Sequence, residues 1–254
     1  MKKNFLLLVF ALSLTQLFAQ NTSKSSKEDR NFRVPLIGEQ APSFTAETTN
    51  GTLNFPSDFG RKWKILFSHP QDFTPVCSTE ILELAHLQGE LDKLGVKIAI
   101  ISTDPVDTHN QWKKSLESLD LNNQGTVKIN FPLIGDDDLK IAKLYGMIHP
   151  ESNTTRSVRG VFVIDPDNVI QVIYFYPTNV GRNTAEILRT LAALETSAKE
   201  STTASKVLAP VNWTPGKDLL VTIPPKAQAS KSSTDVPEGY YSPVWYMWYK
   251  KASQ

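Results

Sequence analysis

The sequence predicts an α/β domain built on a mixed sheet, and three observations lead to that prediction. Short apolar runs typical of buried strands alternate with longer stretches whose apolar residues recur at helical spacing. Two of the runs, 160–164 and 169–176, are separated by Asp165-Pro166-Asp167-Asn168, which is typical of a hairpin between antiparallel strands. The chain of 254 residues is 40% hydrophobic, enough to form a sizeable core. Together these features predict a layered domain whose sheet is mixed.

The elements follow one another from about Phe32. The patterns predict strands at 64–67, 96–101, 160–164 and 169–176, and helices at 78–94, 107–119, 136–144 and 184–197. Asn183 is a suitable cap for the last helix, with Glu186 at its third position. Asp136-Asp137-Asp138 is predicted to be an acidic helix start and no cation site, because further oxygen ligands do not recur at calcium-loop spacing.

The first 31 residues differ from the rest of the chain. Lys2 and Lys3 precede an apolar run, and the stretch ends at Ala19, so 1–19 is predicted to be a signal peptide and 20–31 a flexible polar leader. The run is shorter than the roughly 20 apolar residues that cross a bilayer as a helix. We therefore expect an exported protein, periplasmic or secreted, without stable membrane insertion; a retained anchor is the alternative.

After the domain predicted at 32–198, regular patterning stops, and 199–254 is predicted to be a C-terminal extension. Its segment 239–251 is dense in Tyr and Trp, which a solvated tail does not need. These rings are expected to pack either on their own domain or against a partner subunit.

The totals exclude some functions and leave others open. With 27 basic and 26 acidic side chains, the formal net charge is +1, and no basic run marks a nucleic-acid partner. Four histidines and one cysteine without close ligand spacing predict no metal site. The single cysteine, Cys77, cannot form a disulfide within the chain, so it is buried and inert, paired between chains, or reactive.

The segment 67–80 favours the reactive alternative. Cys77 lies where a buried strand gives way to a helix, and the first turn of a helix favours a thiolate through its unpaired N–H groups. Thr74 could turn its hydroxyl toward the sulfur as a donor, although a hydroxyl in this place often serves only the turn. Pro70 could crowd the pocket without offering a competing proton donor.

These residues resemble a known family. Pro70-x-x-x-Thr74-x-x-Cys77 is similar to the peroxiredoxin active-site signature, and 68–77 resembles its one-cysteine, peroxiredoxin 6-like branch. The segment 159–165 resembles the strand that carries the active-site arginine, and 176–183 resembles a further family segment. The resemblance covers about residues 33–225.

The resemblance implies a thioredoxin-like fold and the reduction of hydrogen peroxide and organic hydroperoxides, with no metal, haem or flavin. The Cys77 thiolate would attack the peroxide and become a sulfenic acid, while Thr74 and Arg159 position the peroxide and stabilise the leaving oxygen. Arg182 and Glu80 would hold Arg159 in position. His69 could contact the pocket or could serve as a structural hydrogen-bond partner, and both alternatives stay open. Without the resemblance, Arg159 would be interpreted as an ordinary surface arginine at the end of a strand.

The resemblance also implies an external thiol reductant. Two-cysteine relatives carry a resolving cysteine shortly before a Trp-x-Pro-Gly segment, and here Ala209 stands in that place, four residues before Trp213. A homodimer is expected from the family. Two alternative functions remain at this point: a chaperone-like oligomer in which Cys77 is incidental, and a redox sensor that passes oxidation to another protein.

Overall fold

The computed structural model describes residues 33–222, 236 and 238–252. The predicted signal peptide and leader lie outside the described residues. The described residues divide into two compact units, one formed by 33–78 together with 97–180, the other by 79–96 together with the described residues from 181 onward. The unit that holds the predicted C-terminal extension therefore also includes the helix predicted at 184–197.

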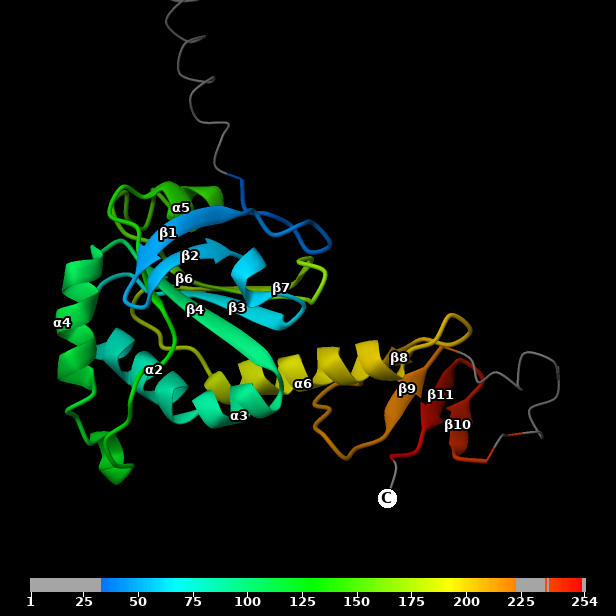
Figure 1. The fold of residues 1–254 in the computed structure, drawn as a ribbon. Coiled ribbons are helices and arrows are strands. Elements are labelled where there is room, and N and C mark those ends of the chain that lie inside the picture. Colours follow the sequence, from blue (N-terminus) through cyan, green and yellow to red (C-terminus); the bar gives the residue numbers. More distant parts are fainter. Residues whose placement is uncertain (1–32, 223–235, 237, 253–254) are drawn as a thin grey trace, which may run out of the picture. The chain divides into compact units, whose positions relative to one another are not determined.

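The first unit is built on a seven-stranded sheet in the order β2-β1-β5-β4-β3-β6-β7 (Figure 1). Its strands are β1 (Phe44–Thr48), β2 (Gly51–Phe55), β3 (Trp63–Ser68), β4 (Val96–Ser102), β5 (Leu133–Gly135), β6 (Arg159–Ile164) and β7 (Ile170–Tyr176). The four strands predicted from the apolar runs are all present, whereas β1, β2 and β5 were not predicted. These three are short or only half-buried, so their apolar signal is weak.

The sheet is mixed, as predicted. β4 and β5 run parallel, and β6 runs antiparallel to both β3 and β7. The register pairs Phe67 near the end of β3 with Val161 near the start of β6, and Arg159 at the start of β6 with Tyr176 at the end of β7. The end of β3, the start of β6 and the end of β7 thereby lie at the same end of three adjacent strands, which is where the candidate site lies.

Helices and apolar side chains cover the sheet. One core cluster of this unit joins sheet residues such as Leu66, Ile101 and Phe162 to α5 (Lys140–Leu144) and to Tyr145, whose ring is fully buried. α4 (Val106–Leu116) buries Trp112 and Leu116. Two single turns, η2 (Ser57–Phe59) and η3 (Leu121–Asn123), complete the unit.

Two predicted helices differ from the structure. The helix predicted at 78–94 is interrupted at Leu87 and forms α2 (Pro75–His86) and α3 (Gln88–Lys93). The helix predicted at 136–144 is reduced to α5, because Leu139 adopts a left-handed conformation with φ of 62°. Asp136 is buried before it, and its carboxylate accepts hydrogen bonds from the backbone N–H groups of Ile141 and Ala142 at 2.8 and 2.7 Å. The acidic run therefore precedes and caps the start of a helix, as expected, but that helix begins at Lys140, later in the chain than predicted.

In the second unit, α6 (Thr184–Glu200) begins at Asn183, whose side chain accepts from the backbone N–H of Glu186 as predicted. A four-stranded sheet follows in the order β10-β11-β9-β8. Its strands are β8 (Val207–Leu208), β9 (Leu219–Val221), β10 (Tyr240–Val244) and β11 (Met247–Lys250). The aromatic segment thus forms the β10–β11 hairpin, which was not predicted.

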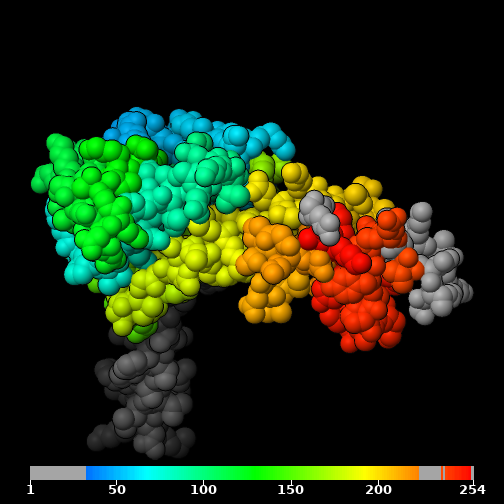
Figure 2. Space-filling view, turned by 90° about the horizontal axis from the view of Figure 1, so that it is seen from below, coloured from blue at the N-terminus to red at the C-terminus, as the bar shows by residue number. Residues whose placement is uncertain are grey.

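The hairpin divides its aromatic side chains between two environments. Tyr240 and Trp248 pack on the unit's own core with Trp213 and Val221. Trp245 and Tyr246, at the turn, are 86% and 65% exposed, and the hairpin is visible in red on the surface in Figure 2. Across the part of the chain that the structure describes, no helix combines the length and apolar character needed to cross a membrane.

Candidate active site

Cys77 is the third residue of α2 and is fully buried. The helix begins at Pro75, whose ring suits the first helical position because no intrahelical N–H bond is lost there. In the first turn, the backbone carbonyl of Thr74 accepts from both the N–H and the hydroxyl of Ser78. Cys77 therefore lies among the unpaired N–H groups at the positive end of the helix, as the sequence predicted.

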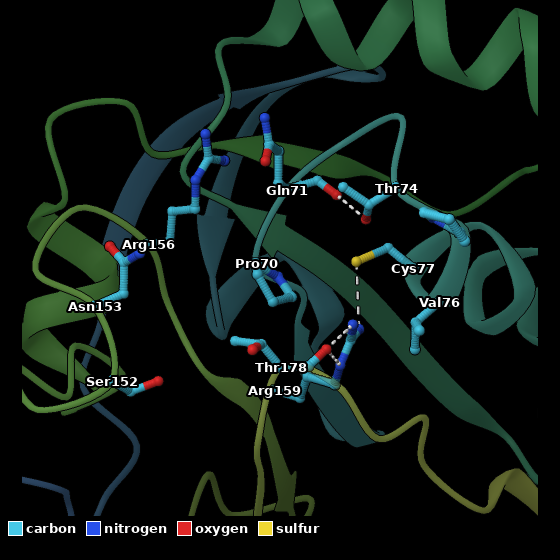
Figure 3. A pocket seen from close by; sticks show the side chains of 11 residues that line it. Pro70, Gln71, Thr74, Val76, Cys77, Ser152, Asn153, Arg156, Arg159 and Thr178 are labelled. Atoms are coloured by element: carbon cyan, nitrogen blue, oxygen red, sulfur yellow. Dashed lines mark hydrogen bonds between the residues drawn. The ribbon is translucent and has the colours of Figure 1, made fainter.

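Arg159 lies beside the sulfur. Its Nη1 donates to Cys77 Sγ at 3.3 Å, while Nε and Nη2 donate to the backbone carbonyl of Thr178 at 3.0 and 2.6 Å (Figure 3). The guanidinium is held by a carbonyl on one side and the sulfur on the other, and the residue is only 2% exposed. A permanent cation fixed in this way forms a stronger hydrogen bond with a thiolate than with a thiol.

The fold explains why these residues meet. β3 leads into the loop that carries Cys77, and its antiparallel partner β6 begins with Arg159 beside the end of β3. β7 ends at Tyr176, directly before Pro177 and Thr178, so the carbonyl that holds Arg159 comes from the segment after the third strand. The site is assembled by sheet register, and local sequence alone does not create it.

Thr74 lines the pocket, but its hydroxyl does not donate to the sulfur. Instead Oγ1 donates to the backbone carbonyl of Gln71 at 2.9 Å. A threonine three residues after a carbonyl in a tight turn readily makes this local bond. The hydroxyl oxygen is thereby oriented as an acceptor, which corrects the expectation that Thr74 acts on Cys77 as a donor.

The pocket around Cys77 encloses about 320 Å³. Figure 3 shows Cys77, Val76 and Thr74 on one side of it and Asn153, Ser152 and Arg156 on the other. The predicted residues that line it are Pro70, Thr74, Cys77 and Arg159; those that the sequence did not single out include Gln71, Ser152, Asn153, Arg156 and Thr178. Thr178 contributes through its backbone carbonyl, and residues 152–156 belong to a loop without periodicity, so neither gives a sequence signal.

His69 is not among the residues that line this pocket. It is fully buried, with its ring 5.0 Å from that of Trp112 and its Nε2 3.5 Å from Oδ1 of Asp72. Its backbone carbonyl accepts from the hydroxyl of Ser157 at 3.2 Å. Of the two alternatives for His69, these contacts favour the structural one, because the side chain is buried beneath the loop and does not line the pocket.

A buried pair, Asp72 and His109, also lies under this loop. Nε2 of His109 is 2.9 Å from the carbonyl oxygen of Ile134, which only accepts, so this nitrogen carries a hydrogen. Nδ1 is 2.7 Å from Oδ2 of Asp72. A neutral imidazole and a carboxylate could not satisfy both contacts, so the pair shares one additional proton. Burial raises the pKa of Asp72, against the lowering effect of His109, in agreement with a retained proton.

The same three side chains are a conceivable metal-binding group. Donor atoms of His69, Asp72 and His109 lie within 4.8 Å of one another, and all three residues are buried. However, both ring nitrogens of His109 already form hydrogen bonds, with Oδ2 of Asp72 and with the carbonyl oxygen of Ile134. The donor set therefore fits a proton-holding pair better than a cation site.

Glu80 and Arg182 form a buried bidentate ion pair in the second unit. Nε and Nη2 of Arg182 each donate to one carboxylate oxygen of Glu80 at 2.8 Å, and the Arg182 backbone N–H donates to Oε1 at 2.8 Å. Their side chains are 3% and 1% exposed. The two residues predicted to act together are thus in direct contact, and their effect on Arg159 stays a prediction.

Comparison with known proteins agrees with this geometry. Residues 37–173 match the AhpC/TSA family. A peroxiredoxin from Methanosarcina mazei is 42% identical over 223 residues, covering 87% of this chain and all of the relative. This chain belongs to the AhpC/TSA family. It is a peroxiredoxin of the one-cysteine type, a thiol-dependent peroxidase that reduces hydrogen peroxide and organic hydroperoxides through a cysteine sulfenic acid and is regenerated by an external thiol.

Solved structures of similar proteins support the thioredoxin-like fold. A yeast mitochondrial 1-Cys peroxiredoxin shares 36% identity and a TM-score of 0.71, covering 86% of this chain and all of that chain. A cysteine-to-serine mutant of peroxiredoxin 6 from Arenicola marina shares 31% identity and the same TM-score, covering 87% and 99%. The predicted fold class is therefore confirmed.

Proposed function

We propose that Cys77 is the residue that reacts with peroxide and that Arg159, Thr74 and Pro70 form its immediate surroundings. The observation that supports this most directly is the hydrogen bond from Arg159 to Sγ, made by a guanidinium that is itself held by the Thr178 carbonyl. The sulfur faces a pocket whose volume of about 320 Å³ admits a peroxide. No other cysteine occurs in the chain.

The reaction proceeds by displacement at oxygen. The thiolate forms an S–O bond as the O–O bond breaks, the sulfur is oxidised to sulfenic acid, and the departing oxygen takes up a proton to leave as an alcohol or water. The cation of Arg159 stabilises the negative charge that moves onto that oxygen, and the Thr74 oxygen accepts the hydrogen of a hydroperoxide. Pro70 narrows the pocket.

Regeneration requires two thiol groups, which come from two monothiol molecules or from one dithiol. The first attacks the sulfenic sulfur, forming a mixed disulfide while the oxygen leaves as water, and the second releases the Cys77 thiolate and a free disulfide. Ala209, where two-cysteine relatives place a resolving cysteine, cannot contribute to this step. The related yeast protein is described with glutathione and thioredoxin systems, and a reductant of either kind is our proposal for this chain.

The assembly and location of the protein are part of the proposal. Oligomers are typical of the family, and we propose a homodimer, which sedimentation analysis of the purified protein would test. The Lys-led apolar N-terminus supports export to the periplasm or the extracellular space. Analysis of the N-terminal residue of the protein recovered from cell fractions tests this, and a protein retained in the cytoplasm with Met1 intact would contradict it.

Peroxide consumption with excess dithiothreitol tests the assignment of Cys77. The wild type is expected to turn over, and Cys77→Ser is expected to lose turnover completely, because a serine hydroxyl is not ionised at neutral pH. Cys77→Ser and wild type should give the same circular dichroism spectrum, which separates loss of chemistry from loss of fold. Turnover by Cys77→Ser would overturn the assignment, and oxidation of Cys77 without turnover would favour a redox sensor.

A further inference from the structure

Two arginines line the active-site pocket, and they differ in what holds them. Arg159 donates to Cys77 and Thr178 and is buried. Arg156 is half-buried and forms no hydrogen bond or ion pair with any other residue that the structure describes. It lies on the side of the pocket opposite Cys77 (Figure 3). A guanidinium directed to a pocket without a protein partner is available to a ligand.

The outer part of the pocket is polar and lacks negative charge. Beside Arg156 it is lined by the amides of Gln71 and Asn153 and by the hydroxyl of Ser152. No Asp or Glu is among the residues that line the pocket, so the two guanidinium groups are not neutralised there. Glu151, in the same loop, is exposed and does not line it. Hydrogen peroxide would occupy only a small part of about 320 Å³, so a larger reactant can reach both sides.

These observations identify the chemistry that fits. Arg159 is committed to the sulfur and to a carbonyl, so the anionic part of a reactant meets Arg156, while its reacting group meets Cys77. A planar carboxylate matches the paired donors of a guanidinium. We propose that Arg156 is a specificity-determining residue that holds the carboxylate of a small reactant at the outer end of the pocket. This inference rests on the peroxidase function proposed for Cys77.

The carboxylate could belong to either reactant, and the test separates the two. In one arm, Cys77 is oxidised by a small alkyl hydroperoxide that carries a carboxylate, and the rate is compared with that of the methyl ester of the same hydroperoxide. In the other arm, mercaptopropionate and uncharged mercaptoethanol each reduce the sulfenic acid made by hydrogen peroxide. Rate constants are measured by stopped flow for wild type, Arg156→Gln and Arg156→Lys.

The informative quantity is the ratio of wild-type to variant rate constants for each reactant, because intrinsic reactivity cancels in it. In at least one arm, Arg156→Gln is expected to lower the rate constant of the carboxylate-bearing reactant about tenfold more than that of its uncharged partner. Arg156→Lys is expected to recover part of this difference, and added salt to reduce it. The arm that shows the effect identifies the source of the carboxylate.

Arg61→Gln is the matched control. Arg61 lies before β3, at the end of the strand away from the loop that leads to Cys77, and its side chain is 78% exposed in an ion pair with Asp167. Arg61→Gln removes the same charge at a residue that does not line the pocket. The ratio of wild-type to Arg61→Gln rate constants should therefore not depend on the charge of the reactant. Equal ratios for charged and uncharged reactants in both arms of Arg156→Gln would overturn the inference. If wild-type Cys77 is not oxidised by hydrogen peroxide, the proposed function itself fails.

Discussion

Arg159 and Arg156 lie three residues apart and line the same pocket, yet they belong to different kinds of structure. Arg159 is the first residue of β6, paired with β7, and its position follows from the register of the sheet. Arg156 lies in the loop before that strand, where no ladder fixes the backbone. The guanidinium of Arg159 donates hydrogen bonds to Cys77 and Thr178, whereas that of Arg156 forms no hydrogen bond or ion pair with the described residues.

This difference separates two tasks within one pocket. The inner end, with Cys77 and Arg159, performs chemistry that every peroxide requires, so its groups must be held in one geometry before the reactant arrives. The outer end only selects which reactant stays, and a residue that exchanges water for a ligand needs no protein partner. Substitutions of buried, paired groups should therefore be costly, and substitutions at the loop should change selectivity.

Arg182 extends the comparison to a second buried arginine. Glu80→Gln removes the charge that compensates Arg182 in a pair whose side chains are at most 3% exposed. The free energy of unfolding is expected to fall by about 3 to 5 kcal/mol, because an uncompensated charge stays buried. Urea unfolding followed by circular dichroism measures this.

Glu186→Gln provides the exposed counterpart. Glu186 pairs with Arg189 three residues on, with side chains 42% and 28% exposed. Its loss is expected to cost at most about 1 kcal/mol, since solvent screens the pair. Equal losses from Glu80→Gln and Glu186→Gln would contradict the distinction between buried and exposed charges.

At the inner end itself, Arg159→Gln should slow the oxidation of Cys77 by hydrogen peroxide about 100-fold or more, because the charge on the leaving oxygen loses its cation. Arg159→Lys should recover only part of this, as one ammonium cannot reproduce the planar donors that serve both Sγ and the Thr178 carbonyl. Stopped-flow measurement of the second-order rate constant checks both variants. A change of less than a few-fold in Arg159→Gln would show that the hydrogen bond to sulfur does not matter for the reaction.

A smaller effect is expected beneath the loop, at Asp72. In Asp72→Asn the amide can donate to Nδ1 of His109 as the protonated acid does, so the loss of stability should be about 1 kcal/mol. His109→Ala removes the partner and leaves a cavity, and should cost more. Thermal unfolding of both variants measures the difference.

The contribution of Asp72 to the free energy of unfolding is expected to fall as the pH rises. Its pKa is raised from 3.8 by burial, so the folded protein binds this proton more tightly than the unfolded chain does. The resulting stabilisation is complete below pH 3.8 and is lost as pH rises through the folded pKa. Relative to Asp72→Asn, the wild type should therefore lose stability with rising pH. If the difference in stability between wild type and Asp72→Asn stays constant as the pH rises above 3.8, the pair does not share a proton.

Much of the fold followed from sequence because its central strands are buried on both faces. The runs that became β3, β4 and β6 are nearly continuous in apolar residues and almost wholly buried. β7 is the last strand of the sheet and mostly half-buried, and it was predicted from its apolar sequence and from the turn before it. β1 and β2 were not predicted because only some of their residues are buried. β10 and β11 were not predicted because a high density of aromatic residues does not reveal which segments pair as strands. The end of α5 was predicted, but its beginning depends on the conformation of Leu139, which sequence patterns do not encode.

The candidate site was predictable as far as it consists of side chains in a local motif. Pro70, Thr74 and Cys77 lie within eight residues, and Arg159 was found through the resemblance of its strand. The direction of the Thr74 hydroxyl was wrong because a nearby carbonyl competes for it. The contribution of Thr178 is a backbone carbonyl, and that of Arg156 depends on the path of a loop, so neither has a signature in sequence.

The role of Cys77 is tested most directly by the mass of the protein after one equivalent of hydrogen peroxide. Because the chain contains a single cysteine, the chemistry can be assigned without ambiguity. We expect dimedone to trap a sulfenic acid on the peptide that carries Cys77, and added thiol to reduce the sulfenic acid before it can be trapped. An unmodified Cys77 peptide after full exposure to peroxide, in a correctly folded protein, would contradict it.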